Sequence, residues 1–186
     1  MAATATTRYD TVAMWLHWLI AFLIIFMLVF GGDLMNRQHP DTFNSSVHAS
    51  IGAAILMLSL IRLFWRMRKP TPPLPETMRL WEIALAKTTH VIFYVMMIGL
   101  PISGWLAFSD TVMKHPGFVG TSFFGLLQVV QIPSAVGLPF DGIHGLGSNF
   151  MIALISLHVL AAFKHRFIDK DHLLRRMVPL KLRDNS

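Results

Sequence analysis

The chain has 186 residues, of which 54% are hydrophobic and only 14% charged, and its apolar residues are gathered in long runs. This composition excludes an ordinary soluble globular protein, whose core does not need such runs. The formal net charge of +6 is compatible with nucleic-acid binding in a soluble protein, but here the basic residues lie where a membrane protein places them, so we exclude a nucleic-acid partner.

Four apolar segments predict transmembrane helices, because each is close to the ~20 residues needed to cross a bilayer. They cover roughly residues 12–32, 47–65, 88–108 and 143–163. The first is too long for the apolar part of a signal peptide, and no small-residue cleavage site follows it, so we expect it to be retained. We therefore expect an all-α fold, an integral membrane four-helix bundle that forms a single domain over residues 1–186.

The connections between these helices predict the orientation. All but two of the 16 lysines and arginines lie in the N-terminal segment, around the second connection or in the C-terminal tail; the exceptions are Arg37 and Lys114. A multi-pass protein with both termini in the cytoplasm is expected from this bias. Prolines predict a stiff, extended connection at 69–75, and the long connection at about 109–142 carries an apolar, glycine-interrupted stretch suited to the outer interface.

Histidines recur in the apolar segments at matching depths. His144 and His158 are 14 residues apart, so a helix brings them to nearly the same face at depths that differ by ~21 Å. If the helices alternate in direction, His17 is level with His158 near the cytoplasmic side, and His48 is level with His144 near the outer side. A single intramembrane histidine often only bonds to a neighbouring helix, but two pairs predict the axial ligands of two haems enclosed by the bundle.

The absence of cysteine narrows the type of haem. Without any Cys there is no covalent attachment motif, no iron–sulfur cluster and no thiolate-bound haem, so the expected cofactors are two noncovalent haem b groups. Two histidines on each iron leave no open position for oxygen or substrate. Such an iron is suited to electron transfer.

Several motifs surround these histidines in a fixed order. They are RYDTVAMWLHW at 8–18, VHASIG at 47–52, IRLFWRMRKPTPPLP at 61–75 and KHRFIDKDHLLRRM at 164–177. In this pattern the chain resembles the bacterial cytochrome b561 family of four-helix, di-haem membrane cytochromes, related to the cytochrome b subunits of nickel hydrogenases. The resemblance implies haem b ligation by His17, His48, His144 and His158, electron exchange with ubiquinone in the bacterial inner membrane and, in part of the family, oxidation of superoxide at the outer face.

Two further residues are candidate site residues. His165 lies seven residues after His158 and ~10 Å nearer the cytoplasm, where it could bond to a quinone carbonyl or rest at the headgroup boundary; the resemblance favours the quinone. Arg62 lies 14 residues after His48, at the depth of the inner haem, where it could pair with a haem propionate or serve only as a positive-inside residue.

The remaining candidates have weaker support. His90 could assist a quinone or only cap the third helix, and we favour the cap; we expect Gly52 and Gly147 to leave space for a porphyrin face. No pattern supports a role for three other histidines, His39, His115 and His172.

The sequence does not identify the electron-transfer partner at the outer face of the membrane. Superoxide would favour a positive outer surface, but the outer segments carry four carboxylates against two basic residues: Asp33, Asp41, Asp110 and Asp141 against Arg37 and Lys114. A periplasmic protein, or an isoprenoid- or quinone-binding partner, is therefore the alternative outer partner. A histidine-lined metal or proton transporter is an alternative of another class, but it would need carboxylates within the spans, which have none between their ends.

Overall fold

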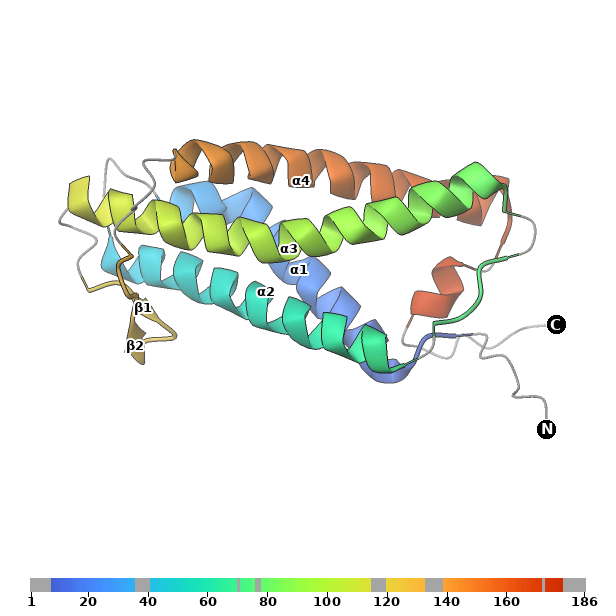
Figure 1. The fold of residues 1–186 in the computed structure, drawn as a ribbon, viewed down its shortest axis with the longest axis horizontal. Coiled ribbons are helices and arrows are strands. Elements are labelled where there is room, and N and C mark those ends of the chain that lie inside the picture. The colour runs from blue at the N-terminus through green and yellow to red at the C-terminus, as the bar shows by residue number, and fades with distance from the viewer. Residues whose placement is uncertain are drawn as a thin grey trace.

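The computed structural model describes residues 8–35, 41–69, 71–75, 78–114, 120–132, 139–171 and 173–178. Four long helices lie along a common direction and form an elongated bundle (Figure 1). They are α1 (Thr11–Leu34), α2 (Thr42–Arg68), α3 (Leu80–Lys114) and α4 (Phe140–Phe163). Each is long and apolar enough to cross a membrane. The predicted all-α four-helix bundle is confirmed.

Capping side chains set where the first two helices begin. Asp10 caps α1 by accepting hydrogen bonds from the amides of Val12 and Ala13, at 2.7 and 3.1 Å. Asp41 caps α2 through the amide of Phe43, at 2.8 Å, so α2 begins five residues before the predicted start. Hydropathy marks the part of a helix that needs hydrocarbon, whereas caps decide where its backbone bonds begin.

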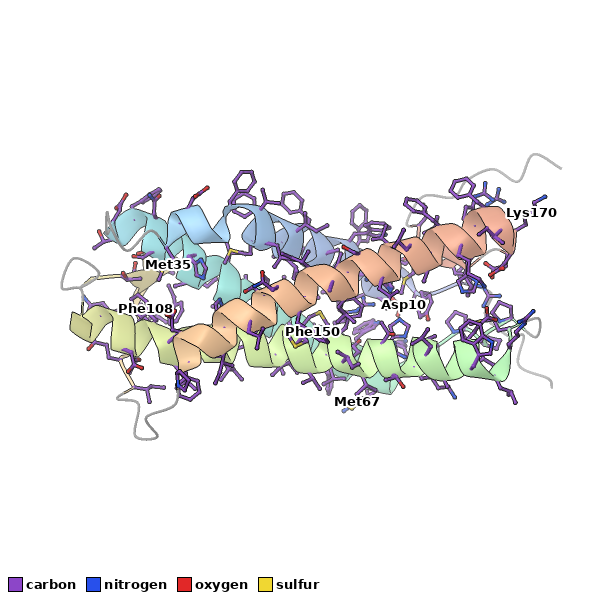
Figure 2. All side chains as sticks on the ribbon, turned by 90° about the horizontal axis from the view of Figure 1, so that it is seen from above. Asp10, Met35, Met67, Phe108, Phe150 and Lys170 are labelled. Atoms are coloured by element: carbon purple, nitrogen blue, oxygen red, sulfur yellow. The ribbon has the colours of Figure 1, made fainter. Side chains whose placement is uncertain are left out.

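Consecutive helices pack against each other: α1 contacts α2, α2 contacts α3, and α3 contacts α4. The two ends of the bundle differ. The start of α1, the end of α4 and the α2–α3 connection lie at one end, and the hairpin described below lies at the other (Figure 1). Met35 and Phe108 mark the hairpin end in Figure 2, and Asp10 and Lys170 lie toward the opposite end. We call these the outer and the inner end.

The distribution of polar and apolar side chains is that of a membrane bundle. Large apolar side chains such as Phe22 (65% exposed), Val29 and Val95 point outward, while Ser45 and Ser59 are completely buried. Small polar residues allow helices to approach closely, and apolar surface is stable against lipid. The buried apolar side chains form two clusters in the described part of the chain. The larger comprises Ile20, Ile24, Ile55, Met97, Met151 and Leu154, and the smaller Phe108, Val112 and Val129.

The outer connection is more ordered than the sequence predicts. Residues 109–114 and 140–142 are helical, and a short antiparallel hairpin, β1 (Ser122–Phe123) and β2 (Leu127–Gln128), stands between them. It is fixed to α2 because Ser46 and Ser50 accept hydrogen bonds from the amides of Ser122 and Phe124, at 2.9 and 2.7 Å. These long-range contacts have no local periodicity, so the sequence predicted a long connection here but neither its helical ends nor its hairpin.

The C-terminal segment closes the inner end. After α4 the chain continues as a π-helix, η2 (Lys164–Ile168), and a 3₁₀ turn, η3 (Leu174–Met177). The carbonyl of Met177 accepts a hydrogen bond from Trp18 Nε1 at 2.8 Å, and that of Arg176 accepts one from the amide of Tyr9 at 3.3 Å. The tail is thereby joined to α1. Arg37, His39, His115 and His172 lie outside the described residues.

Candidate functional site

The inner histidine pair joins the first and last helices. His17 of α1 and His158 of α4 have ring centroids 6.4 Å apart. A third imidazole completes the cluster, since the ring of His90 on α3 lies 6.3 Å from that of His158. His90 also bonds to the backbone of Ala86, one turn earlier. Because α3 begins at Leu80, ten residues before His90, the prediction that His90 caps this helix was wrong. The sequence did not predict the contact of His90 with His158.

The outer pair joins α2 and α4. The ring centroids of His48 and His144 are 6.2 Å apart. Each ring has Nδ1 against a backbone carbonyl, that of Gly31 at 3.1 Å for His48 and that of Leu100 at 3.0 Å for His144. Such a bond fixes the tautomer and leaves Nε2 as the ligand nitrogen, which is the arrangement common among metal-bound histidines.

Both separations fit two imidazoles that share one metal ion. A metal that binds each nitrogen at ~2 Å places the two ring centres ~6 Å apart. The structure thus brings together the two pairs that the sequence matches by depth, and their donor chemistry fits iron held by two histidines. Their assignment as ligands stays a prediction.

A glycine on α3 makes room for the outer pair. A Cβ placed on Gly104 would lie 2.7 Å from Cε1 and 2.9 Å from Nδ1 of His144, so only glycine allows this ring position. On the same turn, Ser103 Oγ lies 3.4 Å from His144 Nδ1. The sequence gives only a weak signal for this role, a small residue in a transmembrane helix that also contains Pro101.

The two glycines proposed from the sequence behave differently. A Cβ on Gly147 would meet Leu100 Cδ1 at 2.8 Å, so this glycine allows α4 to pack against α3. Its proposed role at a porphyrin face stays a prediction. A Cβ on Gly52 would have no atom within 4 Å, so this glycine faces open space.

Arg62 joins three helices near the inner pair. Its Nη1 donates to the carbonyl of Ala13 on α1 at 2.6 Å, its guanidinium bonds to the side chain of Tyr94 on α3, and it interacts electrostatically with His17. A guanidinium has five N–H donors, so others stay available for an anion. One turn earlier, Ser59 Oγ is buried without a hydrogen-bond partner in the described part of the chain. These donors fit a carboxylate near His17.

Asp10 is a charged residue close to Arg62 at the inner end of the bundle. It lines a small inner-end pocket with Arg62, Trp65 and Tyr94. Burial tends to raise the pKa of Asp10, but hydrogen bonds from Trp65 Nε1 and the amides of Ala13 and Val12, together with Lys69, hold that pKa below its ordinary value. The carboxylate is thus kept charged where the chain enters α1.

His165 lies at the inner end, in the π-helix that follows α4. Its Nδ1 is 2.7 Å from Asp171 Oδ2 and 3.0 Å from Asp169 Oδ2. The sequence placed His165 as a donor to a quinone, but gave no signal for Asp171, because a contact made through a chain reversal has no helical spacing. No described residue links His165 directly to the inner pair.

Comparison with known proteins agrees with this arrangement. Residues 8–180 match the family described as prokaryotic cytochrome b561. The chain belongs to this family. It is 28% identical over 187 residues to a probable superoxide oxidase of Yersinia pestis, covering 94% of this chain and 97% of the relative. It is 30% identical over 178 residues to cytochrome b561 homolog 2 of Escherichia coli, covering 92% and 91% of the two chains, and 24% identical to cytochrome b562 of Cereibacter sphaeroides.

The resemblance inferred from the motifs is thereby confirmed. This cytochrome is an integral membrane protein that binds haem b and transfers electrons.

Proposed function

We propose that this cytochrome holds two haem b groups, one between His17 and His158 and the other between His48 and His144. It passes single electrons from superoxide at the outer end to ubiquinone at the inner end, in the bacterial inner membrane with both termini cytoplasmic. The observation that carries this proposal is the pair of ring separations, 6.4 and 6.2 Å, at opposite ends of the bundle.

Bound haem supplies a carrier that gains and loses one electron at a time. The chain supplies the rest. The carbonyls of Gly31 and Leu100 orient His48 and His144, and Arg62 offers its remaining N–H donors to a propionate of the inner haem. His165 lies beyond the inner pair, where a quinone headgroup meets the aqueous boundary. The name of the Yersinia pestis relative supports superoxide as the outer donor.

A second candidate function has the same two haems but a different electron-transfer partner at the outer end. Asp33 and Asp41 are exposed at the outer end, and a negative surface suits a basic periplasmic protein better than a small anion. An isoprenoid- or quinone-binding protein is the same kind of partner. The transporter alternative is disfavoured, since the carboxylates of the described helices lie near helix ends and α2 contains none.

Haem counting tests the ligand assignment. The wild type is expected to bind two haems per chain, His144→Ala to lose the outer one and His158→Ala the inner one, measured by pyridine haemochrome content and redox titration. Because His17 and His90 are almost equally far from His158, both need substitution. His17→Ala should lose the inner haem and His90→Ala should keep it. One haem per wild-type chain would overturn the assignment.

Electron transfer is tested in the same preparations. Stopped-flow mixing with superoxide should reduce the haems, and added ubiquinone should reoxidise them. If ubiquinol reduces the haems but superoxide does not, the second candidate replaces the first.

A further inference from the structure

The inner end contains a histidine held by a dedicated carboxylate. His165 and Asp171 are both largely buried, with side chains 15% and 13% exposed, and Nδ1 of the imidazole lies 2.7 Å from Asp171 Oδ2. His165 lies in the π-helix η2, which continues the chain directly after α4. Such π-turns occur frequently at functional sites.

The backbone fixes Asp171 in this position. The amide of Asp171 donates to the carbonyl of His165 at 3.0 Å, and Asp171 Oδ1 accepts from the amide of Leu173 at 3.0 Å. The chain reverses through Lys170, whose φ of 55° is left-handed. One carboxylate oxygen is therefore used to hold the turn, and the other is directed at the imidazole.

The neighbouring charges leave Asp171 as the main partner of His165. Asp169 Oδ2 also lies 3.0 Å from Nδ1, but Lys164 Nζ neutralises it at 2.7 Å. Lys164 in turn pairs with Glu82 of α3 at 2.6 Å. Because the ammonium group of Lys164 already bonds to Asp169 Oδ2, Asp171 is left as the nearer carboxylate partner of His165, at 2.7 Å against 3.0 Å.

We propose that His165 and Asp171 form a proton-transfer dyad for the quinone at the inner end. This inference rests on the proposed function and assigns its proton chemistry. With Nδ1–H donated to Asp171, the imidazole exchanges a proton through Nε2, and the carboxylate stabilises the imidazolium.

Two proton transfers through the dyad balance the reaction. Two superoxide ions each lose one electron and become oxygen, and ubiquinone gains those two electrons and two protons to become ubiquinol. His165 gives each proton from Nε2 to a quinone oxygen and is reprotonated from the cytoplasmic side. Asp171 acts through His165 and is a positioning residue.

The test compares Asp171→Asn with Asp171→Glu and with the charge-removal control Asp33→Asn, an exposed residue at the outer end. In Asp171→Asn we expect ubiquinone-linked reoxidation of the haems to slow ~10²-fold, at the low end of general acid–base effects. Its pH profile should move to lower pH, because the imidazolium loses its carboxylate partner. Haem content and haem reduction by superoxide without quinone should match the wild type.

Each outcome decides one claim. A wild type that exchanges no electrons with ubiquinone refutes the proposed function itself. An active wild type with an Asp171→Asn variant of equal rate and pH profile refutes the dyad alone. If Asp171→Asn loses haem, Asp171→Glu decides: a wild-type pH profile supports the dyad, and a profile without pH dependence overturns it.

Discussion

Replacing Gly104 with alanine adds a single methyl group at the tightest contact of the outer histidine pair. The new Cβ would lie 2.7 Å from Cε1 of His144, whereas carbon atoms in contact are ~3.5–4.0 Å apart. The ring would therefore have to move by ~0.8 Å or more. Its Nδ1 is held by the carbonyl of Leu100 at 3.0 Å, so the movement also strains that hydrogen bond.

The expected cost follows from these contacts. Overpacking of this kind costs ~1–3 kcal/mol, and weakening the hydrogen bond to Leu100 adds up to ~1 kcal/mol. The higher helix propensity of alanine offsets ~0.5–1 kcal/mol of this cost. The mid-points of these ranges give a net loss of ~1.8 kcal/mol, which weakens binding of the outer haem ~20-fold, since ~1.4 kcal/mol is a factor of ten.

Redox titration of purified Gly104→Ala, with haem quantified by pyridine haemochrome, measures this effect. The outer haem should be depleted or shifted in potential while the inner haem is unchanged. Gly99→Ala is the matched control, because Gly99 lies on the same helix and its Cβ position has no atom within 4 Å. A Gly104→Ala variant with two haems at wild-type potentials would show that His144 does not hold the haem in this ring position.

Three further outcomes are expected. Gly31→Ala should keep both haems at nearly wild-type potentials, because its Cβ would meet His48 Cε1 at an ordinary 3.5 Å; loss of the outer haem in redox titration would contradict this. Stopped-flow haem reduction by superoxide should depend weakly on salt, since the exposed Asp33 and Asp41 provide no positive steering; a steep fall with salt would reveal a focused positive field. Asp10→Asn keeps a capping side chain but removes a carboxylate whose pKa is lowered in the folded state. The ionised carboxylate therefore stabilises the folded protein above its ordinary pKa of ~3.9, and this stabilisation is lost as the pH falls through the lowered pKa. Thermal unfolding should find the variant less stable by a few tenths of a kcal/mol at pH 7, with a difference that disappears on acidification; a difference that persists at low pH would assign the effect to the cap.

The sequence was most informative where a property repeats along a helix. Hydropathy predicted the four spans, and the 14-residue spacing of His144 and His158 predicted two depths on one face, because both follow from the geometry of a single helix. The partners of those histidines could be matched by depth for the same reason.

The sequence was less informative where function depends on contacts between elements. Gly104 and the carbonyl of Leu100 act on a histidine that lies on another helix, and nothing in the local pattern of α3 indicates this. The hairpin depends on Ser46 and Ser50, and the link between Asp171 and His165 depends on a chain reversal. Such positions become visible only once the backbone is placed.

The arrangement of the histidines has a consequence for biogenesis. Both pairs contain one residue from α4, His144 at the outer end and His158 at the inner end. Because α4 follows the other three long helices in the chain, a nascent chain with only α1, α2 and α3 inserted has neither pair complete. Under the proposed ligand assignment, neither haem can be held by both of its histidines until the fourth helix has entered the membrane.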